Sequence, residues 1–192
     1  MSGIRRLAVY CGSAPGADAV FADAARELGR VMAERDIDLV YGGGRLGLMG
    51  IVADTVLDAG GQVFGVIPQA LVDHEVAHRG CTELHTVSGM HERKAKFTEL
   101  ADAFVCLPGG ISTLDELFEA WTWNALGYHA KPFCLLNINR FWEGLGTFMD
   151  HVRDSGFLSE ARRSQLLMAD TPGRALDLLD EAARNGEQGL TW

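Results

Sequence analysis

A glycine turn followed by hydroxyl and carboxylate side chains lies near the middle of the sequence. Residues 103–107 form an apolar run typical of a buried strand, Pro108-Gly109-Gly110 ends it, and apolar residues then recur at helical spacing. A strand, a glycine turn and a helix start in this order direct backbone N–H groups toward an anion. Glu116 lies in the expected first turn of that helix. We therefore expect the loop to hold the phosphate of a nucleotide and Glu116 to act on its sugar.

Glu116 also fits a structural role. Thr113 and Glu116 have the spacing of a capping box, in which the acid accepts a hydrogen bond from the N-cap backbone. Alternatively, Asp115 stabilises the helix end and leaves Glu116 free for chemistry. The residues alone leave both interpretations open.

Two adjacent cations, Arg93 and Lys94, lie near the start of a second expected helix, in the segment Met90-His91-Glu92-Arg93-Lys94. Cations at a helix N-terminus oppose the macrodipole and cost a few tenths of a kcal/mol each. The chain has 17 basic and 26 acidic residues and a formal net charge of −9, so its cations are scarce. An anionic ligand would explain this placement, and a solvated helix face is the alternative.

A further glycine cluster, Gly42, Gly44 and Gly47, fits the pattern G-x-G-x-x-G between a strand and a helix. The NAD fingerprint also requires an acidic residue at the end of the next strand. That strand ends in Val66-Ile67-Pro68-Gln69, without an acid, so NAD is disfavoured. The glycines then serve either a tight turn or backbone contact with a phosphate or with a second glycine loop.

The elements that must position these residues alternate between strands and helices. Apolar runs predict six strands, at residues 7–11, 38–41, 62–67, 82–87, 103–107 and 133–137. Later helices are expected at about 141–154, 159–168 and 172–183, and a frayed tail at 185–192. Continuous apolar strands predict an α/β fold, a Rossmann-like, doubly wound parallel sheet of about six or seven strands with helices on both faces.

Ligands of such sheets bind beyond the carboxyl ends of the strands. Four of these ends are rich in glycine, serine or cations, namely residues 12–13, 42–47, 88–94 and 108–113. Because four such loops converge on one edge, they indicate a site better than any one of them does.

Composition limits the class of protein. A chain of 192 residues suits one domain over residues 1–192, and 47% hydrophobic with 22% charged residues is typical of globular proteins. The net charge of −9 disfavours nucleic acid or an anionic membrane surface as a partner. The run 7–11 is too short for a signal peptide, and no apolar run approaches the ~18 residues of a membrane span. We expect a cytoplasmic protein with four reduced cysteines, Cys11, Cys81, Cys106 and Cys134.

The segment PGGISTLDE resembles the PGGxGTxxE signature of the LOG ("lonely guy") family, the cytokinin-activating nucleoside 5′-monophosphate phosphoribohydrolases. Other segments resemble family segments in the same order: VYCGSAPG, LVYGGGRLGLMG, GVIPQAL, GMHERKA, LGYHAKP and LLNINRFW. The resemblance covers roughly residues 5–180. It implies a Rossmann-like homodimer with its active site near the subunit interface, and Trp121 and Trp123 fit either that interface or the core.

The resemblance also implies site residues. The catalytic pair would be Arg93 and Glu116. The nucleotide and its phosphate would be bound by residues of the glycine loops and of the GMHERKA segment: Ser13, Gly43, Gly44, Met90, Lys94, Gly109, Gly110, Ser112 and Thr113. Ser112 replaces a glycine of the family signature. Serine would strain the loop by roughly 1 kcal/mol if that position needs a positive φ, and otherwise it adds a hydroxyl donor.

The activity implied by the resemblance is hydrolysis of the N-glycosidic bond of N6-prenylated AMP to the free base, a cytokinin, and ribose 5-phosphate. No metal or cofactor is expected. Two alternatives remain: an AMP nucleosidase with little prenyl preference, and a non-catalytic nucleotide- or cofactor-binding carrier of the same fold. Family members have also been labelled lysine decarboxylases, but no lysine here shows the signature of a pyridoxal phosphate site.

Overall fold

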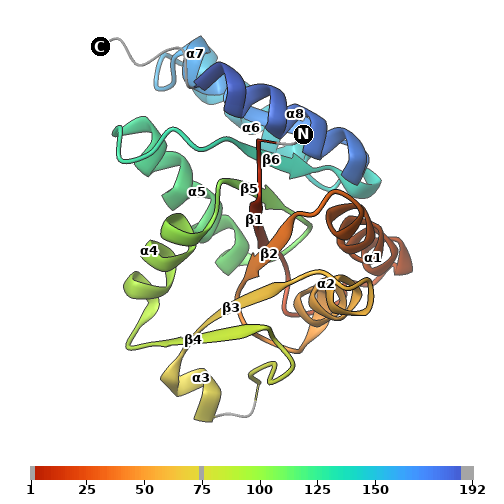
Figure 1. Ribbon diagram of the computed structural model, residues 1–192. Coiled ribbons are helices and arrows are strands. Elements are labelled where there is room, and N and C mark those ends of the chain that lie inside the picture. Colours follow the sequence, from red (N-terminus) through yellow and green to blue (C-terminus); the bar gives the residue numbers. More distant parts are fainter. Residues whose placement is uncertain (1–2, 74–75, 187–192) are drawn as a thin grey trace.

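Seven parallel strands form one sheet in the computed structural model, which describes residues 3–73 and 76–186 (Figure 1). Their order in the sheet is β4-β3-β2-β1-β5-β6-β7. The strands are β1 (Arg6–Tyr10), β2 (Asp38–Tyr41), β3 (Val63–Pro68), β4 (Glu83–Val87), β5 (Ala103–Cys106), β6 (Phe133–Leu136) and β7 (Leu166–Ala169). The helices are α1 (Ala19–Glu34), α2 (Gly47–Asp58), α3 (Gln69–Asp73), α4 (Met90–Leu100), α5 (Ile111–Ala125), α6 (Glu143–Asp154), α7 (Glu160–Arg163) and α8 (Pro172–Gly186), with a 3-10 turn, η1, at Ile138–Arg140.

Helices cover both faces of the sheet, as the continuous apolar strands predict. Successive side chains of β1 point to opposite faces. Leu7 and Val9 pack into a core with α1, α2 and α8, whereas Ala8 and Tyr10 pack into a second core with α4, α5 and α6. Figure 1 shows α1 and α2 on one side of the sheet and α4 and α5 on the other. The doubly wound fold is therefore confirmed.

The sheet reverses its direction of growth between β1 and β5. Strands β2 to β4 extend it from one edge of β1, and β5 to β7 extend it from the other edge. Asp102, just before β5, accepts hydrogen bonds from the backbone N–H groups of Arg5 and Arg6, both at 2.9 Å. At the other end, the Gly12 N–H donates to the Pro108 carbonyl at 3.1 Å. Beyond this bond both loops line one cavity, at the point in the sheet where ligands of such folds bind.

The end of the chain differs from the prediction. The expected helix at 159–168 is wrong, because α7 ends at Arg163 and the chain then forms β7, which pairs with β6. The sequence of β7, LLMA, has high helix propensity, but pairing with the open edge of β6 overrides it. The expected frayed tail is partly helical, since α8 continues to Gly186, and residues 187–192 lie outside the described residues.

Cys11, Cys81, Cys106 and Cys134 are all free thiols, and all but Cys81 are buried. Burial raises the pKa of the Cys134 thiol to about 12, so this group stays protonated. Among the described residues, no helix combines the length and the apolar character needed to cross a bilayer.

Candidate active site

Arg93 and Glu116 face each other beyond the carboxyl ends of the central strands. Arg93 comes from the first turns of α4 and Glu116 from α5, and each residue is only 8% exposed. The Arg93 Nη1 atom lies 3.9 Å from Glu116 Oε1. Two charged side chains that the sequence separates by a whole strand are thus brought into one buried ion pair.

The Arg93 guanidinium is fixed by backbone carbonyls. Its Nε donates to the Val66 carbonyl of β3 at 3.1 Å, and its Nη2 donates to the Gly42 carbonyl after β2 at 3.0 Å. A Cβ atom on Gly42 would lie 2.2 Å from Nη2, so the arginine can occupy this position only beside a glycine. With these two bonds made, Nη1 is directed toward Glu116.

The capping-box interpretation of Glu116 is wrong. Helix α5 begins at Ile111 with Gly110 as its N-cap, so Thr113 is its third residue and Glu116 lies in its second turn. Asp115 does not stabilise the helix end, because its carboxylate pairs with Lys94 at 2.8 Å. Glu116 lies on the buried face of α5, next to the ends of the strands.

Burial sets the charge state of this pair. It raises the pKa of the Glu116 carboxyl to about 7, a shift that Asp115 reinforces and that Arg93 and Lys94 oppose. Burial likewise lowers the pKa of Arg93, and the nearby Glu116 opposes that shift. Glu116 therefore exchanges protons near neutral pH, which suits a group that stabilises or transfers charge during a reaction.

The pair lies in a cavity of about 410 Å³. Part of its lining comes from the expected loops: Ser13, Gly42, Gly44, Met90, Arg93, Ser112 and Glu116. The rest of its lining was not predicted from the sequence and is apolar: Val9, Cys11, Leu46, Met49, Ile67, Leu71 and Val76. In a sequence such residues cannot be distinguished from core residues, and only the position of Leu46 and Met49 beside the glycine cluster hinted at a site.

A second cavity, of about 610 Å³, adjoins the first and shares Ser13 and Ser112 with it. Gly109, Gly110 and the N-terminus of α5 line it. Helix α5 has no side-chain cap, and its first backbone N–H groups have no helical carbonyl to bind. A Cβ atom on Gly110 would meet nothing within 4 Å, so open space lies above this helix start. The geometry suits an anion bound by N–H groups and hydroxyls.

Thr113 and Ser112 have different positions in this loop. Thr113 is fully buried beneath it, and a Cβ atom on Gly109 would lie 2.1 Å from its Oγ1. Thr113 therefore supports the loop from below. Ser112 is the second residue of α5 and lies outside the left-handed region, so the strain considered for serine does not arise. Its side chain lines both cavities.

Besides the buried Thr113, two expected site residues, Lys94 and Gly43, do not line either cavity. Lys94 lies with its Nζ 2.8 Å from Asp115 and 2.5 Å from Glu119, and so links α4 to α5. These carboxylates compensate the cation near the start of α4. Gly43 has φ +70°, and a Cβ atom there would lie 3.1 Å from Ile67, so this glycine shapes the turn.

Gly47 is the last glycine of the cluster formed by Gly42, Gly44 and Gly47. It has φ +59°, and a Cβ atom there would lie 2.3 Å from the backbone of Ser13. The Leu48 N–H donates to the Gly12 carbonyl at 3.1 Å. The cluster thus packs against a second glycine loop, one of the alternatives that the sequence left open.

Comparison with known proteins agrees with this geometry. Residues 49–179 match a family model described as "possible lysine decarboxylase". The chain is 48% identical over 191 residues to the cytokinin riboside 5′-monophosphate phosphoribohydrolase LOG of Oryza sativa subsp. japonica, covering 100% of this chain and 79% of the relative. It is 45% identical over 165 residues to the cytokinin riboside 5′-monophosphate phosphoribohydrolase of Rhodococcoides fascians, covering 85% and 83%.

Among solved structures, the molybdenum cofactor binding protein of Rippkaea orientalis superimposes with a TM-score of 0.71 at 18% identity, over 92% of this chain and 95% of that one. At this identity the likeness concerns the fold alone. The identities of 48% and 45% to the two phosphoribohydrolases, each over more than four fifths of this chain, are decisive for the family. The chain belongs to the LOG family of cytokinin riboside 5′-monophosphate phosphoribohydrolases.

Proposed function

We propose that this chain hydrolyses the N-glycosidic bond of a nucleoside 5′-monophosphate, preferentially N6-prenylated AMP, and releases the free base and ribose 5-phosphate. The observation that carries the proposal is the buried pair of Arg93 and Glu116 between an apolar cavity and the open N-terminus of α5. The apolar lining suits a prenyl substituent, and the helix start suits the 5′-phosphate.

The mechanism follows from this arrangement. Phosphate binding at Gly110 and Ser112 positions the ribose over Glu116. Cleavage of the bond between C1′ and the base nitrogen leaves an oxocarbenium-like sugar, which the Glu116 carboxylate stabilises. Arg93 Nη1 donates a hydrogen bond to the departing base. Water then adds its oxygen to C1′, and its proton completes the base.

The decarboxylase description finds no support in the lysines. The chain has three, Lys94, Lys96 and Lys131, and all lie within the described residues. Lys94 pairs with Asp115 and Glu119, Lys96 with Glu99, and Lys131 donates to the Thr98 carbonyl. No lysine lines either cavity at the site, so none is positioned to form a Schiff base with pyridoxal phosphate.

The test is chromatography of the free base after incubation with isopentenyladenosine monophosphate and with AMP. We expect faster release from the prenylated nucleotide and a loss of at least about 10²-fold in Glu116→Gln. Equal rates with both nucleotides would instead favour an AMP nucleosidase. No release from either, with binding still detected by calorimetry, would refute hydrolysis and favour a non-catalytic carrier.

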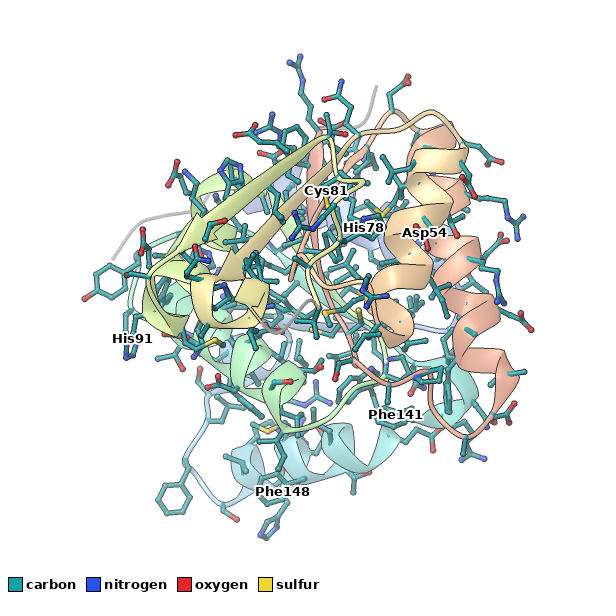
Figure 2. All side chains as sticks on the ribbon, turned by 90° about the horizontal axis from the view of Figure 1, so that it is seen from below. Asp54, His78, Cys81, His91, Phe141 and Phe148 are labelled. Carbon is teal, nitrogen blue, oxygen red and sulfur yellow. The ribbon has the colours of Figure 1, made fainter. Side chains whose placement is uncertain are left out.

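We also propose that the single domain, residues 1–192, forms a homodimer in the cytoplasm. Trp121 is a core residue at 5% exposure, and with its neighbours it lines an apolar groove between α5 and α6. Phe148 and Phe157, each next in sequence to a residue that lines this groove, are 58% and 87% exposed (Figure 2 labels Phe148). Such exposed aromatics support a subunit contact, and the four free thiols support a reducing compartment.

Sedimentation analysis tests the assembly. We expect the wild type to sediment as a dimer and the double variant Phe148→Ser, Phe157→Ser as a monomer with unchanged circular dichroism. A double variant that remains dimeric would exclude this face as the interface.

A further inference from the structure

One wall of the substrate cavity is a short segment that belongs to no strand. Val76 lines the cavity, and the segment that follows it runs antiparallel to the glycine turn after β2. The Arg45 N–H donates to the Val76 carbonyl at 2.9 Å, and the His78 N–H donates to the Gly43 carbonyl at 2.8 Å. Within the described residues, which resume at Val76, two backbone hydrogen bonds flank a single bridge in this wall.

The side chain of His78 ties this segment to α2. Its Nε2 lies 2.9 Å from Asp54 Oδ1, and its Nδ1 accepts a hydrogen bond from the Gly80 N–H at 3.1 Å. Because Nδ1 accepts, the neutral ring carries its proton on Nε2 and donates it to Asp54. Figure 2 shows His78 between Cys81 and the Asp54 side chain of α2.

The same helix also lines the cavity. Met49, in the first turn of α2, contributes to the wall, and Asp54 follows about one and a half turns later. The contact between His78 and Asp54 therefore fixes Val76 relative to Met49. The His78 side chain is 11% exposed, whereas that of Asp54 is 66% exposed, so Asp54 has little part in the core.

We propose that His78 and Asp54 are positioning residues that hold Val76 against the cavity and thereby set its preference for a base with a bulky apolar substituent. This inference rests on the proposed function. A wall that can move away leaves an apolar substituent with fewer contacts, whereas an unsubstituted base loses little. The contact should consequently affect selectivity far more than the chemical step.

The test compares Asp54→Ala, which removes the acceptor, with Asp54→Asn, whose amide oxygen still accepts from His78. For Asp54→Ala we expect KM for isopentenyladenosine monophosphate to rise about tenfold. The kcat for both nucleotides and the KM for AMP should stay within about twofold of wild type. Asp54→Asn should remain close to wild type. An unchanged ratio of the two kcat/KM values in folded Asp54→Ala, or a loss of kcat equal for both nucleotides, would overturn the proposal.

Hydrogen exchange gives a readout that needs no activity. The amides of Arg45 and His78 close the bridge, and in Asp54→Ala we expect them to exchange at least about tenfold faster while amides of β1 are unaffected. Unchanged exchange at both amides would overturn the proposal by itself. If the wild type cleaves neither nucleotide, the proposed function fails, and the exchange data still decide whether the contact holds the wall.

Discussion

Substituting Gly42 by alanine tests the geometry of the catalytic pair directly. The new Cβ atom would lie 2.2 Å from Arg93 Nη2, whereas ordinary contacts begin near 3.4 Å, so the guanidinium must move by roughly 1 Å. Gly42 is not among the glycines with positive φ, so the backbone itself accepts alanine. The change therefore acts on Arg93 rather than on the turn.

The expected loss follows from that displacement. Moving the guanidinium breaks its 3.0 Å bond to the Gly42 carbonyl and alters the 3.9 Å approach to Glu116. A misplacement of about 1 Å in a catalytic group can cost on the order of 10²-fold in rate. We expect base release from isopentenyladenosine monophosphate to fall by about that factor in Gly42→Ala.

Gly144→Ala is the matched control. Gly144 is exposed on α6, and a Cβ atom there would meet nothing within 4 Å. This variant should keep wild-type activity and gain up to about 1 kcal/mol of stability. If folded Gly42→Ala retains activity within about threefold of the control, Arg93 does not depend on its position against the Gly42 carbonyl, and the reasoning is refuted.

Three further predictions concern charge and strain. Because burial raises the pKa of Glu116 to about 7, kcat/KM should rise with pH through about 7. If the residual activity of Glu116→Gln shows the same rise, the titrating group is the substrate phosphate, and the assignment to Glu116 is contradicted. The same raised pKa means that ionised Glu116 destabilises the folded state. The free energy of unfolding should therefore fall as the pH rises from about 4.5 to 7. Urea unfolding should find Glu116→Gln more stable than wild type at pH 8 by up to roughly 3 kcal/mol, with the difference vanishing near pH 4. Arg140 has φ +61°, so Arg140→Gly should raise the melting temperature by a few degrees, and a lower value would contradict strain there.

The sheet was predictable from the sequence because its strands are buried on both faces. The largely apolar runs at residues 7–11, 38–41 and 103–107 match β1, β2 and β5 to within one residue at each end. Strand β7 was not predictable, since its four residues favour a helix until β6 offers them an edge. Local propensity contains no information about the free edge of β6, which lies about 30 residues earlier in the chain than β7.

The site was predictable where its residues are unusual for their place. Arg93 stood out as a cation near a helix start, and Glu116 as an acid after a glycine turn. The partners that position them did not stand out. Lys94 was expected to bind a ligand, and its charge is paired with Asp115 and Glu119, which lie about one turn apart on another helix. The apolar cavity lining resembles core composition and carried no separate signal.

β1 and β5 are adjacent in the sheet although β2, β3 and β4 separate them in the sequence, and this affects folding during synthesis on the ribosome. Residues up to about 100 contain β1 to β4 and Arg93, but one edge of β1 stays unpaired until β5 has been synthesised. An unpaired edge in an emerging chain is a site of mispairing. Asp102 accepts hydrogen bonds from the backbone of Arg5 and Arg6 and so aligns β5 with β1. Pairing of β5 with β1 covers that edge and also places Glu116 beside Arg93. A truncated product that ends before β5 would therefore lack Glu116 and leave one edge of β1 exposed to mispairing.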